Sequence, residues 1–223
     1  LHAHPELSGQ EEWTAERLAS ELAAAGFAVT RGVGGHGIVG ILSRGDGPVL
    51  MIRADMDGLP VREETGLPYQ SNARARDAYG REVDVMHACG HDLHMAAFIG
   101  AARALSARRD WSGTLVMVGQ PSEETVSGAA RMIADGLFTR FPRPHAAIAL
   151  HVAPDIPSGK IGWREGIISA GGESLDIAVY GIGGHAAHPE RARDPVVIAA
   201  QMVLAFQTIV SREVPPGELG IIT

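Results

Sequence analysis

The fold is decided by residues 92–119, which read DLHMAAFIGAARALSARRDWSGTLVMVG. In the first half, apolar side chains recur at the spacing of an amphipathic helix: Met95, Phe98, Ile99, Ala102 and Leu105. The second half, residues 113–119, is an apolar run with the length of a buried strand. A helix that leads directly into a buried strand is typical of α/β proteins with a parallel sheet.

The same alternation continues on both sides of this stretch. The predicted helices cover residues 10–25, 92–108 and 127–135. The predicted strands lie near residues 27–30, 37–42, 49–54, 113–119 and 146–151. Between them runs a long charged loop, residues 58–86, which we expect at the surface. The fold class is therefore α/β, with a largely parallel sheet flanked by helices.

After Gly171 and Gly172 the pattern changes. Residues 175–180 alternate between apolar and polar side chains, which predicts a strand. Apolar residues then follow at helical spacing: Val196, Ala199, Val203, Phe206 and Val210. We place the start of a second, smaller α+β domain here, so that the domains are residues 1–170 and 171–223.

Three imidazoles, a carboxylate and the single thiol of the chain lie within residues 87–94, HACGHDLH. Cys89 has His87 and His91 two positions away on either side. Thiolate and imidazole are donors that zinc, manganese, cobalt or nickel accept, so this segment predicts a metal site. The alternative interpretation is a surface loop with accidental histidines.

Two adjacent glutamates, Glu123 and Glu124, follow the predicted strand 113–119. Adjacent carboxylates at the end of a strand face different ways, so one can ligate a metal ion while its neighbour acts on a water molecule. A helix start is the alternative, because acidic side chains suit a helix N-terminus and Ser122 is a suitable cap. The pattern alone does not decide between them.

His151 interrupts a short apolar run, residues 146–152, AAIALHV. A lone histidine in such a run is more often a satisfied core residue than a ligand. Here it follows two other segments that carry potential ligands, and we therefore interpret it as a ligand. A strand of this kind ends at the carboxyl edge of the sheet, where open α/β sheets keep their sites.

Six motifs occur in order and together span the chain. They are LHAHPELS (1–8), RADMDGLP (53–60), HACGHD (87–92), QPSEE (120–124), LHV (150–152) and GGHAAHP (183–189). With them the chain resembles the aminoacylase and carboxypeptidase family of dinuclear metallohydrolases. The resemblance is to the amidohydrolase branch that includes hippurate hydrolase, N-acetyldiaminopimelate deacetylase and indole-acetyl-amino-acid hydrolase.

The resemblance implies a set of metal ligands and a general base. Cys89, His91, Glu124 and His151 match the ligands of two divalent metal ions per subunit, with zinc or manganese expected before cobalt or nickel. Glu123 matches the general base, which takes a proton from the attacking water and returns it to the leaving amine. Cys89 is then a ligand rather than a nucleophile, although a thiolate beside histidines also fits a nucleophile if the glutamate pair is set aside.

Asp55 is a further expected catalytic-site residue, in a supporting role. Related peptidases have a histidine ligand two residues before this aspartate, whereas this chain has Arg53, which is always protonated and cannot bind a metal ion. Asp55 is expected to orient a ligand through a hydrogen bond. Asp92 and His94 are interpreted in the same way, or as residues of the helix start.

His185 belongs to the glycine-rich motif of the second domain. A phosphate-binding loop is excluded there, because the motif lacks the lysine and the glycine spacing that phosphate binding needs. The resemblance implies instead a lid domain that forms a homodimer, in which His185 reaches the partner's active site and stabilises the oxyanion. His188 is expected to be structural.

Composition limits the remaining possibilities. The net charge of −7 and pI near 5.8 argue against a nucleic-acid partner. One cysteine excludes an internal disulfide, and a reducing cytoplasm suits a thiolate ligand. The most apolar helical stretch, residues 195–210, is shorter than the roughly 20 residues that span a bilayer, so no membrane is expected.

The ends of the chain predict an N-terminal fragment of a longer protein. The chain begins at Leu1 and ends in an apolar run, residues 220–223. The resemblance implies that residues 1–170 are the first segment of a catalytic metal-binding domain and residues 171–223 an incomplete lid. A final metal-binding histidine and much of the substrate pocket would lie outside the chain, so we expect the isolated piece to be inactive.

The resulting prediction is a metal-dependent amidohydrolase that cleaves the amide bond of an N-acyl amino acid or a similar small conjugate. The alternatives are a dipeptidase or carboxypeptidase on the same scaffold, and a non-catalytic metal-binding or dimerisation protein. Arg53 and Cys89 together count against the peptidases, because they match the amidohydrolase branch. Glu123 counts against the non-catalytic protein, since its loss would be the mark of one.

Overall fold

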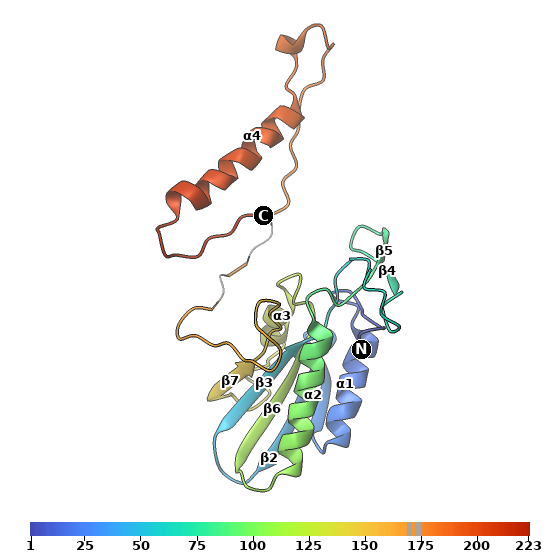
Figure 1. Cartoon of the computed structure of the whole chain (residues 1–223), viewed down its shortest axis with the longest axis vertical. Helices are drawn as coiled ribbons and strands as arrows, with labels where there is room; N and C mark the ends of the chain where they lie inside the picture. Colours follow the sequence, from blue (N-terminus) through green and yellow to red (C-terminus); the bar gives the residue numbers. More distant parts are fainter. Residues whose placement is uncertain (169–170, 173–174) are drawn as a thin grey trace. The chain divides into compact units, whose positions relative to one another are not determined.

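The computed structural model describes residues 1–168, 171–172 and 175–223 (Figure 1). They form two compact units, Leu1–Asp155 and Ile156–Thr223. The predicted domain boundary between residues 170 and 171 adjoins residues outside the described ranges and stays a prediction.

The first unit is built on a five-stranded sheet with the order β1-β2-β6-β3-β7 (Figure 1). The strands are β1 (Ala28–Val33), β2 (Gly37–Arg44), β3 (Val49–Asp55), β6 (Gly113–Gln120) and β7 (Ala146–Ala149). Strand β2 pairs antiparallel with β1 and β6, whereas β3 pairs parallel with β6 and β7. Four strands therefore run in one direction and β2 in the other, which confirms the predicted α/β fold with a largely parallel sheet.

The three predicted helices of this unit are confirmed and cover both faces of the sheet. They are α1 (Glu12–Ala24), α2 (His91–Ala107) and α3 (Gly128–Ala134). Figure 1 shows α1 and α2 side by side across one face. Leu115 and Met117 of β6 pack with these two helices, while Val116 and Val118 pack with Met132 of α3. Alternate residues of β6 thus bury into opposite layers, as the two-residue period of a strand requires.

The register of the parallel strands places the candidate site. Asp55 at the end of β3 lies opposite Gln120 at the end of β6, and Arg53 lies opposite Ala149 at the end of β7. Because these carboxyl ends meet at one edge, the segments that follow the three strands begin side by side. They are residues 56–58, 121–124 and 150–152, so His151 lies two residues beyond β7 rather than inside the predicted strand.

Most residues of the loop over residues 58–86 are exposed, as predicted, although a few of its side chains are buried. It contains the two-stranded hairpin of β4 (Arg74–Arg76) and β5 (Glu82–Asp84). Glu63, Ser71 and Val85 within it are buried. The Ser71 hydroxyl donates to the Val85 carbonyl at 2.6 Å, and the Ser71 N–H donates to Glu63 at the same distance. These internal hydrogen bonds fold a charged segment back onto the unit.

The second unit contains one long helix and one isolated β-bridge in its described part. The elements are the 3₁₀-helix η1 (Pro189–Arg191), the helix α4 (Pro195–Thr208) and the π-helical turn η2 (Ile209–Glu213). Asp194 caps α4 by accepting the Val196 N–H at 2.9 Å. The predicted strand over residues 175–180 is wrong, because nothing in residues 175–223 pairs with it; the bridge joins Ile182 to Arg193.

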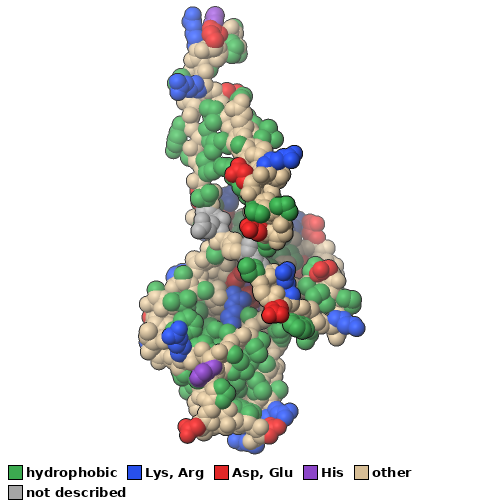
Figure 2. Space-filling view, turned by 90° about the vertical axis from the view of Figure 1, so that its left-hand side faces the viewer, with side chains coloured by type: hydrophobic (Ala, Val, Ile, Leu, Met, Phe, Trp, Pro, Cys, Tyr) green, Lys and Arg blue, Asp and Glu red, His purple; other side chains and the backbone are tan. Residues whose placement is uncertain are grey.

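The apolar helical stretch of the second unit is longer in the structure than expected. With its π-helical turn the helix runs from Pro195 to Glu213, 19 residues of mean hydropathy 1.4, and none of it is buried. By length and composition it is able to cross a membrane, although one such helix is weak evidence of a span. Hydrophobic side chains are visible on the surface in Figure 2, and on α4 Val196 and Leu204 are 73% and 69% exposed.

Candidate metal centre

His91 is the central residue of the site. It is the first residue of α2 and is fully buried. Its Nδ1 lies 2.8 Å from the backbone carbonyl oxygen of Asp57, which only accepts, so Nδ1 carries the proton and donates. In the neutral ring Nε2 then presents a lone pair, and in the described structure this buried atom has no hydrogen-bond partner.

Carboxylates surround the free nitrogen of His91. Its Nε2 lies 3.6 Å from Asp55 Oδ2 and 3.7 Å from both Glu123 Oε2 and Glu124 Oε1. Burial alone lowers the pKa of His91, but the contacts with Asp57, Asp55 and Glu124 outweigh it and raise that pKa above its usual value. The surroundings therefore favour a positive charge at this point, whether it is a proton or a metal ion.

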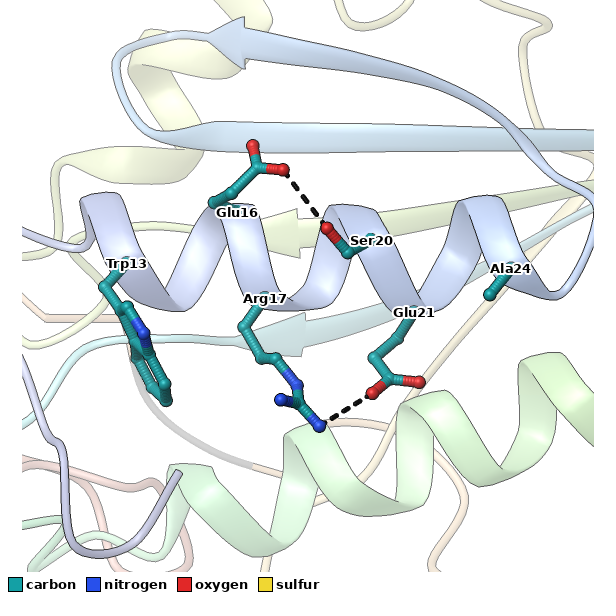
Figure 3. A pocket seen from close by; sticks show the side chains of 6 residues that line it. All are labelled: Trp13, Glu16, Arg17, Ser20, Glu21 and Ala24. Atoms are coloured by element: carbon teal, nitrogen blue, oxygen red, sulfur yellow. Dashed lines mark hydrogen bonds and ion pairs between the residues drawn. The ribbon is translucent and has the colours of Figure 1, made fainter.

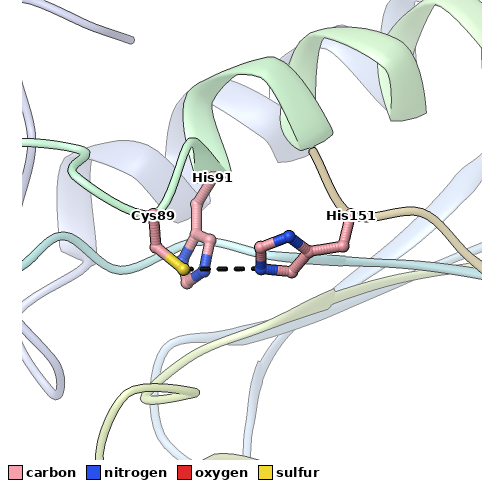
Figure 4. Close-up of side chains that lie close together, drawn as sticks. All are labelled: Cys89, His91 and His151. Atoms are coloured by element: carbon pink, nitrogen blue, oxygen red, sulfur yellow. Dashed lines mark hydrogen bonds between the residues drawn. The ribbon is translucent and has the colours of Figure 1, made fainter. Parts of the chain in front are cut away.

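Cys89 and His151 face each other beside His91 (Figure 4). Cys89 Sγ lies 3.4 Å from His151 Nε2, and His151 Nδ1 lies 2.7 Å from the carbonyl oxygen of Val152. Nδ1 of His151 is thus the donor to a backbone carbonyl, and its Nε2 is directed towards the thiol. Burial, followed by the nearby Glu124, raises the pKa of Cys89 to about 11, so the thiol needs a bound cation to become a thiolate ligand.

The two glutamates differ in their depth. The side chain of Glu124 is 19% exposed and that of Glu123 is 38% exposed. Oε1 of Glu124 is buried and has no hydrogen-bond partner among the described residues, and burial raises the pKa of this carboxyl. The deeper position of Glu124 suits a metal ligand, and the greater exposure of Glu123 gives its carboxylate access to water.

The donor atoms fit a divalent metal ion. Three groups of donors share His91: Cys89–His91–His151, His91–Glu123–Glu124 and Asp55–His91–His94. Within each group the donor atoms lie within 4.8 Å of one another. The first two groups bring all four predicted ligands together. A cation at this point would satisfy both orphaned buried atoms, His91 Nε2 and Glu124 Oε1. Mixed sulfur, nitrogen and oxygen donors suit zinc.

Asp55 and His94 support the ligands through hydrogen bonds. Asp55 accepts from His94 Nδ1 at 2.7 Å and from Arg53 at 2.7 Å. Despite its burial, these partners lower the pKa of Asp55 to about 2, so it is a carboxylate. His94 Nε2 accepts the N–H of Val152 at 2.9 Å, which ties the residue after His151 to α2. Both nitrogens of His94 are engaged, so it is not available as a ligand.

Asp57 is a residue of the site that the sequence prediction missed. This buried carboxylate accepts the N–H groups of Glu123 and Glu124 at 3.1 and 3.0 Å, and the Ser8 hydroxyl at 2.6 Å. Its backbone carbonyl also holds His91. The sequence feature that could have indicated Asp57 is its position two residues after Asp55, just beyond the end of β3.

A histidine of the first motif forms a second carboxylate cluster beside the site. His2 Nδ1 lies 2.8 Å from Asp92 Oδ2, and His2 Nε2 lies 3.0 Å from Glu63 Oε1. Burial lowers the pKa of His2, but the hydrogen bonds to Glu63 and Asp92 outweigh it and raise that pKa. The first residues of the chain are thereby joined to the start of α2, which begins with His91.

His185 is described within the second unit only. Its Nδ1 accepts the N–H of Ala187 at 3.1 Å, so in the neutral ring the proton lies on Nε2. His188 lies 3.4 Å from Glu190. An exposed histidine with a free Nε2–H is chemically suited to donate to an oxyanion.

Among the cavities of the first unit, one lies along α1 and another adjoins the site. A surface cavity of about 390 Å³ is formed along α1 by Trp13, Glu16, Arg17, Ser20, Glu21 and Ala24 (Figure 3). Arg17 of this cavity lies 2.9 Å from Glu21, whereas Glu16 pairs with Arg31 outside the lining, and none of the predicted site residues line it. The other, about 210 Å³, is largely apolar and adjoins the site at Arg53 and His94. Of these two cavities only the second is relevant to the metal centre.

Comparison with known proteins matches the chain to one protein family. The sequence profile of peptidase family M20/M25/M40 matches residues 51–220. Hippurate hydrolase of Campylobacter jejuni is 38% identical over all of this chain and 56% of its own length. The N-acetyl-L-cysteine deacetylase of Bacillus subtilis is 37% identical over all of this chain and 51% of its own length. The chain thus spans about half the length of the curated relatives it matches.

Solved structures agree with the sequence matches. A protein of methicillin-resistant Staphylococcus aureus, described as an aminohydrolase, covers the whole chain with 34% identity and a TM-score of 0.74, over 57% of its own length. A dinuclear metal-binding peptidase of Bacillus subtilis covers 74% of this chain with 37% identity and a TM-score of 0.66, over 44% of its own length.

Proposed function

The chain belongs to peptidase family M20/M25/M40, and on this premise we propose that it provides the metal centre of an amidohydrolase that cleaves N-acyl amino acids. Relatives that are named hippurate hydrolase and N-acetyl-L-cysteine deacetylase support this substrate class. Because the chain spans about half of these relatives, the activity is proposed for the whole protein.

One observation carries the proposal. The free Nε2 of His91 lies 3.7 Å from both glutamates, and Cys89 and His151 lie in one donor group with it. This arrangement needs a cation, because it gathers several potential anions around a buried atom with no other partner. We assign Cys89, His91, Glu124 and His151 as ligands for two divalent ions, zinc or manganese before cobalt or nickel.

When bound, the metal ions would supply Lewis acidity, lowering the pKa of water and polarising the amide carbonyl. Glu123 takes one proton from the attacking water as the new carbon–oxygen bond forms. It returns that proton to the amide nitrogen as the carbon–nitrogen bond breaks, which releases an amine and a carboxylic acid that loses its proton to solvent. Asp55 accepts hydrogen bonds from Arg53 and His94, and it stays negatively charged beside His91 throughout the reaction.

The second unit is proposed as part of a lid that forms a homodimer. His185 would donate its Nε2–H to the oxyanion in the partner's active site, which agrees with the proton position set by Ala187. The boundary after residue 170 and a cytoplasmic location belong to the same proposal.

The test is hydrolysis of a panel of N-acyl amino acids by the whole protein, with and without a chelator. We expect release of the free amine that stops with the chelator and returns with added zinc or manganese. Turnover that survives complete removal of metal would contradict the proposed chemistry. A matched panel of dipeptides distinguishes the amidohydrolase from a peptidase on the same fold.

A further inference from the structure

The turn that carries the two glutamates has an unusual backbone. Ser122, immediately before Glu123, has φ of 51°, and Val126 has φ of 52°. Residues other than glycine rarely occupy this left-handed region, because Cβ approaches the following carbonyl oxygen. Ser122 is also buried. Such a conformation persists only where the surroundings hold it, and it is common at active sites.

Glu11 holds Ser122. This carboxylate is fully buried, and it comes from a part of the sequence 111 residues earlier. Its Oε1 accepts the N–H of Ser122 at 2.7 Å and the Ser122 hydroxyl at 3.2 Å. Its Oε2 is buried and has no partner in the described residues. Burying a carboxylate that has only one partner residue costs folding free energy. We therefore expect the contact between Glu11 and Ser122 to have a function.

Capping of α1 does not explain Glu11. Although Glu11 is the N-cap position of this helix, its side chain makes no capping hydrogen bond. The N–H groups of Trp13 and Thr14 in the first turn donate to Glu6 instead, at 3.1 and 2.7 Å. The Glu11 carboxylate therefore does not cap α1, and its hydrogen bonds go to Ser122 in the turn that carries Glu123 and Glu124.

Glu11 and Asp57 act on the same turn. The N–H groups of Ser122, Glu123 and Glu124 are consecutive, and they donate in order to Glu11, Asp57 and Asp57. A row of successive N–H groups is a natural cradle for anions, and here the protein's own carboxylates fill it. The backbone of the turn is thus fixed from one side, while the Glu123 and Glu124 side chains lie near His91.

We propose that Glu11 is a positioning residue whose Oε1 holds Ser122 in its left-handed conformation and so aims Glu123 and Glu124 at the metal centre. This inference rests on the proposed function, because it deepens the role given to the glutamates. Glu11 acts through the position of its acceptor oxygen rather than through its negative charge.

Two conservative substitutions at Glu11 separate the position of its acceptor oxygen from the charge of its carboxylate. Glu11→Gln keeps an acceptor oxygen at the same distance from Ser122 and removes the charge. Glu11→Asp keeps the charge and withdraws the oxygen by one methylene. The same two substitutions at the neighbouring Glu12, which is exposed in the first turn of α1, serve as matched controls.

The measurement is the affinity of the whole protein for Zn²⁺ by calorimetry and for Cd²⁺ by its charge-transfer absorption with the Cys89 thiolate. We expect Glu11→Gln to bind like the wild type and Glu11→Asp to bind about 10- to 100-fold more weakly, the usual effect of losing a residue that orients ligands. Both Glu12 variants should bind like the wild type. Far-ultraviolet circular dichroism checks that each variant is folded.

A third variant, Ser122→Gly, tests the conformational argument. Glycine adopts the left-handed region without strain, so the turn no longer depends on Glu11. Added to Glu11→Asp, it should recover part of the lost affinity, and also the fold if Glu11→Asp alone is unfolded. No recovery would contradict the inference.

Other outcomes are equally decisive. If Glu11→Asp binds like the wild type, or if Glu11→Gln is as weak as Glu11→Asp, the inference is wrong while the proposed metal centre stands. If the whole wild-type protein binds neither ion, the metal centre itself is wrong and the inference falls with it.

Discussion

His91 and His151 show how backbone carbonyls prepare side chains for a metal ion. Each Nδ1 donates to a carbonyl, His91 to Asp57 and His151 to Val152, at 2.8 and 2.7 Å. This fixes the ring orientation and leaves the Nε2 lone pair of both residues available to a metal ion. The two histidines come from different segments but present the same nitrogen to the same space.

At the residue scale, the roles of the two glutamates are separable. Glu123→Gln in the whole protein removes the proton acceptor but no assigned ligand. We expect turnover to fall by about 10²- to 10⁴-fold, the usual worth of a general base, with metal content unchanged. Glu124→Gln, the matched variant, should lower metal content first. Turnover and metal content are measured on the same samples, and an active Glu123→Gln would show that the base is another residue.

A pH effect is expected from Glu63. Hydrogen bonds from Thr65 and the Ser71 N–H hold its pKa at about 2, against an ordinary value of 4.5. Its contribution to the free energy of unfolding is therefore present above the ordinary pKa and is lost as the pH falls through about 2. Urea unfolding of the metal-free chain should show a shallower acid loss for Glu63→Gln than for the wild type.

The neighbouring Glu64 provides the control for this effect. It is exposed, and Glu64→Gln should follow the acid loss of the wild type. If Glu63→Gln loses stability in acid as steeply as the wild type, the hydrogen bonds from Thr65 and Ser71 do not stabilise the folded state through the ionised Glu63.

The ligand candidates were predictable from the sequence, whereas the residues that hold them were not. Cys89, His91 and His151 are of the types that bind metal ions, and their chemistry is visible in the sequence. Asp57 and Glu11 act by accepting backbone N–H groups from a turn more than 60 residues away. Any carboxylate accepts such a bond, so only the fold reveals which ones do.

At the element scale, the start of α2 is packed too closely for a side chain at Gly90. This residue has φ of 75°, and a Cβ there would lie 2.5 Å from Val152 Cγ2. Gly90→Ala should therefore destabilise the chain by at least the roughly 1–2 kcal/mol of the left-handed conformation. It should also weaken metal binding, because Gly90 lies between Cys89 and His91.

Gly100 is the matched control within the same helix. It is exposed, and a Cβ there meets nothing within 4 Å. Gly100→Ala should stabilise the chain by about 0.5–1 kcal/mol, because alanine is the better residue in a helix interior. Urea unfolding measures both changes. Equal effects at the two positions would show that the close approach of Val152 is not a constraint.

A strand was predicted correctly where the structure also contains the neighbouring strands that hydrogen-bond to it. The strand predicted over residues 113–119 is observed as Gly113–Gln120, flanked by β2 and β3. The strand predicted over residues 175–180 has an equally suitable pattern but no partner in the described second unit. Alternation indicates a side chain's preference for a sheet, and hydrogen bonding to a neighbour is needed to form one.

At the scale of the whole molecule, the proposed homodimer makes its own prediction. If His185 serves the partner's site, a mixture of His185→Ala and Glu123→Gln subunits should regain part of the activity that each lacks alone. Mixed dimers would contain one site with both residues intact. The measurement is turnover after the two inactive proteins are unfolded and refolded together. No recovery in verified mixed dimers would place His185 in its own subunit's site or outside catalysis.

The most direct test of the central claim is anomalous diffraction from crystals of the whole protein grown with zinc. We expect a metal peak bounded by Cys89 Sγ, His91 Nε2, His151 Nε2 and a Glu124 oxygen, with Glu123 beside it but not required as a ligand. A zinc-loaded crystal with no peak among these residues, or with its metal held by a different set, would contradict the assignment.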